Sequence, residues 1–199
     1  IMFALVESGS ITKYFSGNKG VTINNVQHPK SIFTLWTEAE RNAIGVYTVE
    51  IDATNKKDEF YYINTDITYT FSGGKAKGAY GTATAKALTD TLYTAQDETD
   101  GYGTEGDVKV MGLKSQFISN VKATAANELG KTDWYITRKT EKNTAIPSAV
   151  TTHRDAVRTK QAEMETAITN AADVAALETL YTSVDGNPRP IGHIPTKEF

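Results

Sequence analysis

Hydrophobic and polar residues follow two different rhythms along the chain, and the change falls near residue 107. Before that point, aromatic and β-branched residues alternate with polar ones, and turn residues recur. Such alternation is typical of half-buried strands. After it, Ala, Lys, Glu and long apolar residues occur at helical spacing. The pattern predicts an α+β chain in four segments. These are an N-terminal antiparallel β-rich domain (1–95), an acidic Gly-containing linker (96–106), a helical hairpin or bundle (107–183) and an extended C-terminal tail (184–199).

Within the β-rich domain, strands are predicted at 2–6, 11–15, 46–52 and 60–71, where the last run (FYYINTDITYTF) has the strongest strand pattern. Residues 72–78 read as a hairpin loop, with the return at 79–85. Thr37 and Glu40 form a capping-box pattern that predicts a short helix over 38–43.

The helical part is predicted from about 107 to 129, 133–142, Pro147 to about 170, and from an Asp173 cap to 181. Residues 97–107 contain five acids, three glycines and no base. Asp97 is followed by Thr99 and Gly101, which breaks the calcium-loop spacing, so a solvated linker is favoured over a calcium site.

Candidate interaction residues lie in the second half of the chain. Trp134 and Tyr135 form an aromatic node that is expected to pin two helices together. Arg154 and Arg158 belong to a basic stretch (131–160) for which a solvated face is favoured over a partner-binding face. Val157, Met164 and Ile168 mark a narrow apolar stripe, favouring packing within the chain over contact with another copy. The tail residues Pro188, Pro190, Ile191, Ile194 and Phe199 suggest an arm that becomes ordered on a partner.

Composition excludes several classes of chemistry. The chain of 199 residues has no cysteine, and its three histidines lie far apart. The net charge of −3 argues against a nucleic-acid partner. No apolar run approaches the ~20 residues that span a membrane, and the first six residues do not form a signal peptide. Neither 72–78 nor any other segment matches a phosphate loop or a catalytic motif. We therefore expect no cofactor, no metal and no catalytic residue. The apolar fraction of 39% suggests a modest core or burial against partners.

Three segments carry a resemblance to a known group of proteins. MFALVESGSITKY (2–14) resembles the opening hairpin of phage virion proteins. HPKSIFTLWTEAERNAIGVYTVE (28–50) resembles their next segment, an acidic capped helix followed by Gly and a strand. TDWYITRKTEKNTAIPSAVTTHRDAVR (132–158) resembles the C-terminal helical hairpin of phage tail and tail-fibre-associated proteins, including the Asp-Trp node and the Arg154 and Arg158 repeat.

The resemblance implies a non-enzymatic structural component of a bacteriophage tail. An adaptor or connector in the baseplate or tail-fibre attachment region is favoured, because the chain lacks a repetitive shaft and a receptor-binding tip. Its partners would be other tail proteins (fibre, baseplate or tail tube), with a homo-oligomer or several copies per tail. The protein would be made in the host cytoplasm and would reside in the virion. Two alternatives stay open: a tail-fibre assembly chaperone that leaves the particle, and, more distantly, a host-glycan hydrolase using carboxylates among Asp52, Asp58 and Asp66.

Overall fold

The structure is a computed structural model that describes residues 2–199. It contains 37% helix and 23% strand, with the strands concentrated in the N-terminal part and the long helices in the C-terminal part, which confirms the α+β prediction. The chain divides into two compact units, Ile1–Thr84 and Ala85–Phe199.

A five-stranded sheet forms the first unit, with the strand order β2-β1-β5-β8-β7. The strands are β1 (Phe3–Glu7), β2 (Ser10–Phe15), β5 (Val46–Asp52), β7 (Ile67–Ser72) and β8 (Lys75–Tyr80). Strands β5 and β8 pair in parallel, whereas the other neighbours are antiparallel. The predicted antiparallel pairing thus holds for three of the four neighbouring pairs; it fails at β5–β8, because β8 enters the sheet between β5 and β7.

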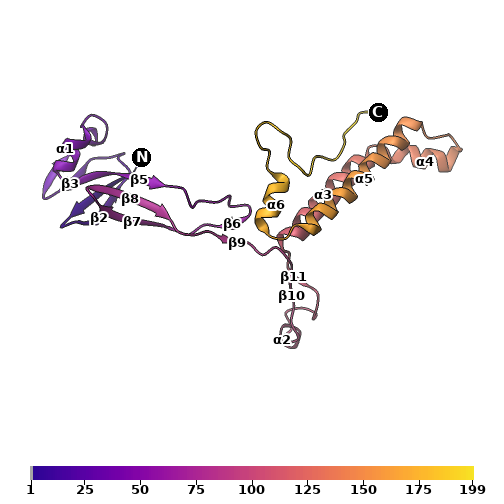
Figure 1. Ribbon diagram of the computed structural model, residues 1–199, viewed down its shortest axis with the longest axis horizontal. Coiled ribbons are helices and arrows are strands. Elements are labelled where there is room, and N and C mark those ends of the chain that lie inside the picture. Colours follow the sequence, from indigo (N-terminus) through magenta and orange to yellow (C-terminus); the bar gives the residue numbers. More distant parts are fainter. Residues whose placement is uncertain (1) are drawn as a thin grey trace. The chain divides into compact units, whose positions relative to one another are not determined.

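Short elements complete the first unit. Strands β3 (Val21–Ile23) and β4 (Val26–His28) pair with each other, as do β6 (Tyr62–Ile63) and β9 (Thr84–Ala85). A 3₁₀ turn, η1 (Lys30–Phe33), precedes helix α1 (Glu38–Ala43), whose Thr37–Glu40 capping box is confirmed. Figure 1 shows β3 and α1 beside the sheet.

Side chains pack on both faces of this sheet. One face joins η1 through a cluster of buried residues, namely Phe3, Leu5, Phe15, Ile23, Ile32, Phe33 and Val46. The other face holds the smaller cluster of Ala4, Val49 and Ala76. Burial on both faces follows from β1, whose first four residues (3–6) are apolar and point alternately to opposite sides.

Two strand predictions need correction. The segment 60–71 is not one strand, because Asp58 accepts a hydrogen bond from the Phe60 backbone N–H and a turn precedes the two-residue β6. The loop at 72–78 is in fact a two-residue turn of Gly73 and Gly74, both with positive φ (58° and 72°). Paired positive φ values are the geometry of a tight hairpin turn, for which glycine is favoured.

The second unit begins with a hairpin and continues as helices. The hairpin strands β10 (Thr91–Leu92) and β11 (Val108–Val110) enclose helix α2 (Ala95–Thr99). The segment predicted as a linker (96–106) is thus structured, because Thr94 and Asp97 form a second capping box. The helices that follow are α3 (Leu113–Gly130), α4 (Asp133–Lys142), α5 (Ser148–Asn170) and α6 (Val174–Tyr181).

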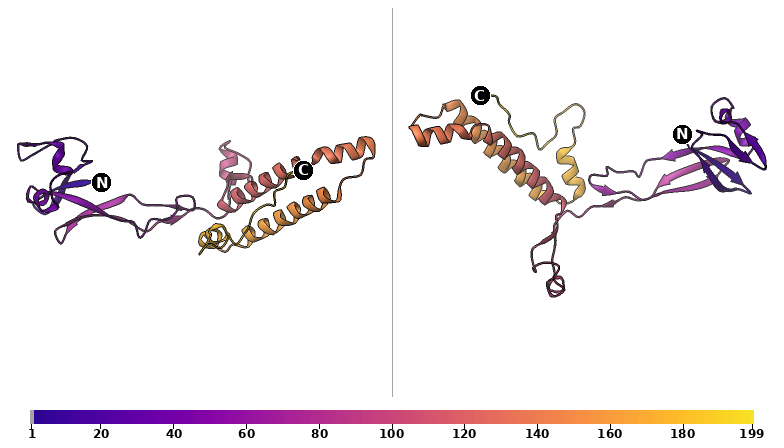
Figure 2. Two further views of the ribbon diagram at one scale, coloured as in Figure 1. Left: turned by 90° about the horizontal axis from the view of Figure 1, so that it is seen from above. Right: turned by 180° about the vertical axis from the view of Figure 1, so that it is seen from behind.

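Helices α3 and α5 lie side by side in all three views (Figures 1 and 2). Helix α3 starts six residues later than predicted from Asp107, because Val108–Val110 pairs with β10 and Gly112 is the N-cap. From α3 the interface buries Leu113, Phe117, Val121, Ala125 and Glu128. Within residues 2–199, no helix is both long and apolar enough to cross a bilayer.

Candidate functional site

The helical unit carries an exposed cluster of aromatic and cationic groups on α4. The rings of Trp134 and Tyr135 lie 3.8 Å apart, and the Arg138 guanidinium lies 4.7 Å from the Trp134 centroid and 5.2 Å from the Tyr135 centroid. Trp134 is 51% exposed. The expectation that these rings pin two helices together is wrong for Trp134, because its indole stacks on neighbours within α4. The cluster therefore presents aromatic and cationic groups together on one surface.

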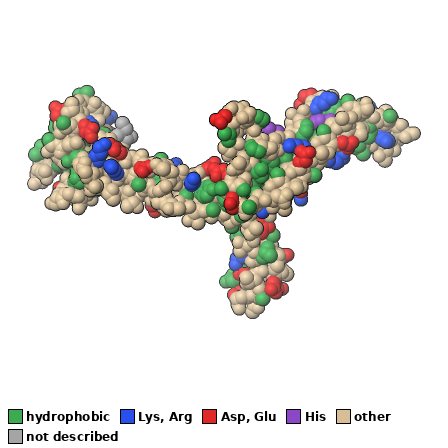
Figure 3. Space-filling model, in the orientation of Figure 1, with side chains coloured by type: hydrophobic (Ala, Val, Ile, Leu, Met, Phe, Trp, Pro, Cys, Tyr) green, Lys and Arg blue, Asp and Glu red, His purple; other side chains and the backbone are tan. Residues whose placement is uncertain are grey.

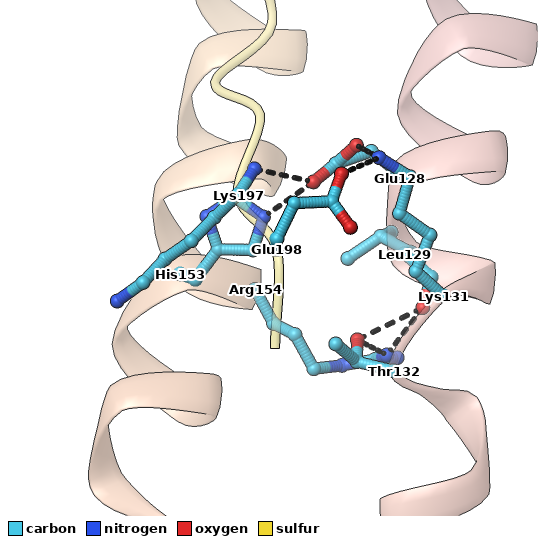
Figure 4. Close-up of polar contacts among 8 residues, drawn as sticks. All are labelled: Glu128, Leu129, Lys131, Thr132, His153, Arg154, Lys197 and Glu198. Carbon is cyan, nitrogen blue, oxygen red and sulfur yellow. Dashed lines mark hydrogen bonds and ion pairs between the residues drawn. The ribbon is translucent and has the colours of Figure 1, made fainter.

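A buried arginine fixes the junction between α3 and α4 (Figure 4). Arg154 is 8% exposed, and its Nη1 donates to the Leu129 carbonyl and the Thr132 hydroxyl, both at 2.7 Å. The same nitrogen lies 2.8 Å from the exposed Asp133 carboxylate. Since the last carbonyls of a helix lack intrahelical donors, a cation there is favourable. Arg154 is thus a structural clamp within the chain and is not available to a partner.

A second buried polar group joins α3 and α5 to the tail, also drawn in Figure 4. Glu128 is 4% exposed, and its Oε1 lies 2.9 Å from Nε2 of His153 and accepts from the Lys197 backbone N–H at 3.0 Å. Its other oxygen lies 2.8 Å from Nζ of Lys131. The Lys131 hydrogen bond holds the pKa of Glu128 below its usual range, although burial acts in the opposite direction. The carboxylate is therefore charged and fully partnered.

The remaining predicted residues divide into buried and exposed groups. Buried within this chain are Val157, Met164, Ile168, Ile191 and Ile194. Packing within the chain accounts for the α5 stripe. The C-terminal tail was expected to become ordered only on a partner. That expectation does not hold, since the Ile191 N–H donates to the Leu180 carbonyl at 3.0 Å. Exposed are Arg158, which lies 3.3 Å from Asp155, together with Pro188, Pro190 and Phe199.

Helices α3, α5 and α6 and the tail line an open pocket of about 620 Å³. Phe117, Val121 and Met164 form its apolar side. Arg189 lies at its polar side, where its side chain donates to the Gly192 carbonyl at 2.8 Å and lies 2.9 Å from Nδ1 of His193. Its guanidinium also lies 5.2 Å from the Tyr181 ring. These contacts stabilise the turn that returns the tail to the helices.

Two of the three carboxylates considered for hydrolysis, Asp52 and Asp58, serve local turns. Asp52 accepts from the Thr54 N–H at 2.9 Å, which together with the Thr54 hydroxyl lowers its pKa, and Asp58 accepts from the Phe60 N–H at 2.8 Å. In the part of the chain that the structure describes, no group of three or more His, Asp or Glu side chains is arranged to hold a metal ion.

Sequence reasoning missed Glu128 and His153 as a pair, since they lie 25 residues apart. The apolar stripe of α3 offered a signal, because Leu113, Phe117, Val121 and Ala125 recur every four residues and Glu128 falls close to the next position. A charged residue on a buried stripe needs a partner. The identity of that partner depends on the register of α3 against α5.

No protein family, curated protein or solved structure matches this chain.

Proposed function

We propose that the protein is a structural component of a bacteriophage tail. In this proposal it is an adaptor or connector in the baseplate or tail-fibre attachment region, it acts through protein–protein contacts, and no enzymatic step is involved. The proposal has two parts, which rest on different observations. The surface supports a role in an assembly, and the three resembling segments support the phage tail.

The amount of exposed surface is the observation that carries the first part. The chain exposes 12,613 Å². Two separate compact proteins with the masses of the two units would together expose about 11,000 Å² by the usual scaling of surface with mass. The excess does not depend on how the units are placed, because any contact between them would only reduce the exposed area. Taken together, the two units thus expose more surface than free-standing domains of their masses do, as expected for a subunit that completes its burial in an assembly.

Large apolar side chains make up part of this surface. In the first unit, Leu35 is 79% exposed and Ile63 is 60% exposed; in the second, Tyr102 is 70% exposed and Trp134 is 51% exposed. Figure 3 shows hydrophobic side chains interspersed with charged ones over the visible face of the protein. Single exposed apolar residues are ordinary, but groups of them mark contact sites.

The phage tail is proposed from the resembling segments, whose local structures are of the type that the resemblance implies. Residues 2–14 form most of the β1–β2 hairpin. Residues 28–50 contain the capped helix α1, Gly45 and most of β5. Residues 132–158 contain α4 and the first half of α5. These elements support the assignment.

The test is quantitative mass spectrometry of purified tailed particles from cells that express the protein, with a known tail protein as the copy-number standard. We expect the chain at a fixed ratio that is a multiple of three or six per tail, cross-linked to fibre or baseplate proteins. Its presence in infected cells together with absence from washed particles would overturn the adaptor and favour the assembly chaperone. Absence from both fractions of a tailed phage system would overturn the phage assignment itself.

A further inference from the structure

The hairpin of the second unit is well ordered but buries almost nothing. We call residues 91–111 the arm. None of residues 85–111 is buried, yet specific bonds fix their conformation. The Tyr93 N–H donates to the Asp107 carbonyl at 2.9 Å, and the Gly106 N–H donates to the Tyr93 carbonyl at 3.0 Å. Lys109 lies 2.6 Å from Asp97 and lowers the pKa of that carboxyl to about 2.

The arm is a two-stranded ribbon with apolar side chains in solvent. Within residues 2–199, β10 and β11 pair with each other and with no third strand. The exposed fractions are 48% for Leu92, 48% for Val108, 61% for Val110 and 44% for Met111. An isolated two-stranded hairpin is marginal in water, and its edges are templates for association. The arm therefore has the features of a surface that packs against another protein surface.

The net charge of the arm indicates which kind of protein surface would cover it. The arm contains five acids and one base, and that base, Lys109, is already paired with Asp97. Since the whole chain has a net charge of −3, the rest of the chain is positive on balance. Figure 3 shows acidic and hydrophobic side chains together along the arm. Its complement would be a surface that is both apolar and basic.

Helix α4 of the same chain is such a surface. It exposes Trp134 (51%), and Arg138 and Lys142 follow at i+4 and i+8 on the same side of the helix, with Lys139 next to them. Of its two acids, Asp133 is already engaged by Arg154. Aromatic and arginine side chains are the residues most enriched at the centres of protein interfaces.

The arm and α4 cannot meet within one copy. The arm ends just before α3 begins at Leu113, and α4 begins just after α3 ends at Gly130. A helix of this length separates its ends by about 27 Å at 1.5 Å per residue. Two different surfaces at opposite ends of one element meet only between copies. Such a head-to-tail contact generates a ring where the rotation closes.

We propose that the arm of one copy docks on α4 of a second copy. The apolar ribbon packs on Trp134, while the arm acids face Arg138, Lys139 and Lys142. This inference deepens the proposed function by naming one partner, and it rests on that function for its biological setting.

Paired charge reversals test the contact, measured by sedimentation velocity of the full chain. The arm variant combines Asp100→Lys with Glu105→Lys, and the α4 variant combines Lys139→Glu with Lys142→Glu. We expect concentration-dependent self-association of the wild type, weakened about tenfold or more by either variant and by high salt. Mixing the two variants restores association, because each reversed surface meets a reversed complement. The control, Lys19→Glu with Lys30→Glu in the first unit, associates like wild type.

The result that overturns the inference is a wild type that stays monomeric at millimolar concentration. Association that both variants leave unchanged, with no gain on mixing, overturns it equally. Far-UV circular dichroism establishes that each variant is folded, and Val110→Asp tests the apolar part of the arm without touching an acid. A monomeric chain that is nevertheless present in particles refutes only this inference. A self-associating chain that is absent from particles refutes only the proposed function.

Discussion

Replacing Arg154 with alanine is expected to destabilise the helical unit by about 3 kcal/mol. The arginine donates two charge-assisted hydrogen bonds, to the Leu129 carbonyl and the Thr132 hydroxyl, and Thr132 is fully buried. A hydrogen bond to a charged group contributes about 1.5–3 kcal/mol, and removing one partner leaves the other unsatisfied. The ion pair with Asp133 adds little, because that carboxylate is 63% exposed. Two bonds at the lower end of the range yield the stated value.

Urea unfolding followed at 222 nm measures this loss, because the long helices all lie in the second unit. For a unit of this size, m is about 1.5 kcal/mol/M, so the midpoint falls by about 2 M. The matched control is Arg158→Ala, one helical turn further along α5, whose side chain is 53% exposed. We expect that change to cost less than about 0.5 kcal/mol. Arg154→Lys, which keeps a charge but not the planar fork, falls between the two.

Equal midpoints for Arg154→Ala and Arg158→Ala would refute the reasoning, since burial and buried acceptors are what distinguish the two residues. A large loss in Arg154→Ala with complete recovery in Arg154→Met would refute it differently. That pair of results would assign the effect to packing of the side-chain stem instead of its hydrogen bonds.

Three further changes probe the helical unit by the same unfolding assay. The pKa of Glu128 is lowered in the folded state, so the stability that this carboxylate contributes is present above its ordinary pKa near 4.5 and is lost as pH falls through the folded value. Glu128→Gln should therefore flatten the acid side of the profile of unfolding free energy against pH. Gly112→Ala should destabilise, because its Cβ would lie 2.3 Å from backbone atoms of the preceding segment, whereas Gly130→Ala has open space and should stabilise by up to about 1 kcal/mol. Ile191→Ala should cost about 2–4 kcal/mol, because this side chain is 4% exposed, against less than about 0.5 kcal/mol for Val184→Ala, at 57% exposed.

Local patterns predicted local structure well. The Thr37 and Glu40 spacing predicted a capping box that the structure contains, and Asp173 caps α6 through the Ala176 N–H. Each of these features is settled by residues within one helical turn. The equivalent pattern of Thr94 and Asp97 was equally readable, but the surrounding acids and glycines led to the prediction of a linker.

Contacts across long separations were beyond the reach of one sequence. The apolar spacing of α5 identified Val157 and Met164 as packing residues, but Arg154 on the same helix could equally have faced solvent. Its burial depends on the end of α3 meeting α5, which makes carbonyl and hydroxyl acceptors available. The parallel pairing of β5 and β8 likewise depends on which strand of the β7–β8 hairpin lies beside β5, a contact between segments far apart in the sequence.

The position of β5 also has a consequence for the order in which the first unit folds. Hairpins β1–β2 and β7–β8 each join neighbouring segments of the chain, so their loops close quickly. Strand β5 pairs with β1 on one side and with β8 on the other, both at long sequence separation. Such closures are slow, since chain entropy is lost before contacts compensate it. Until β5 is placed, both hairpins keep a free inner edge. Its core residues Val46 and Val49 are therefore the positions where a substitution should most slow folding and most promote aggregation.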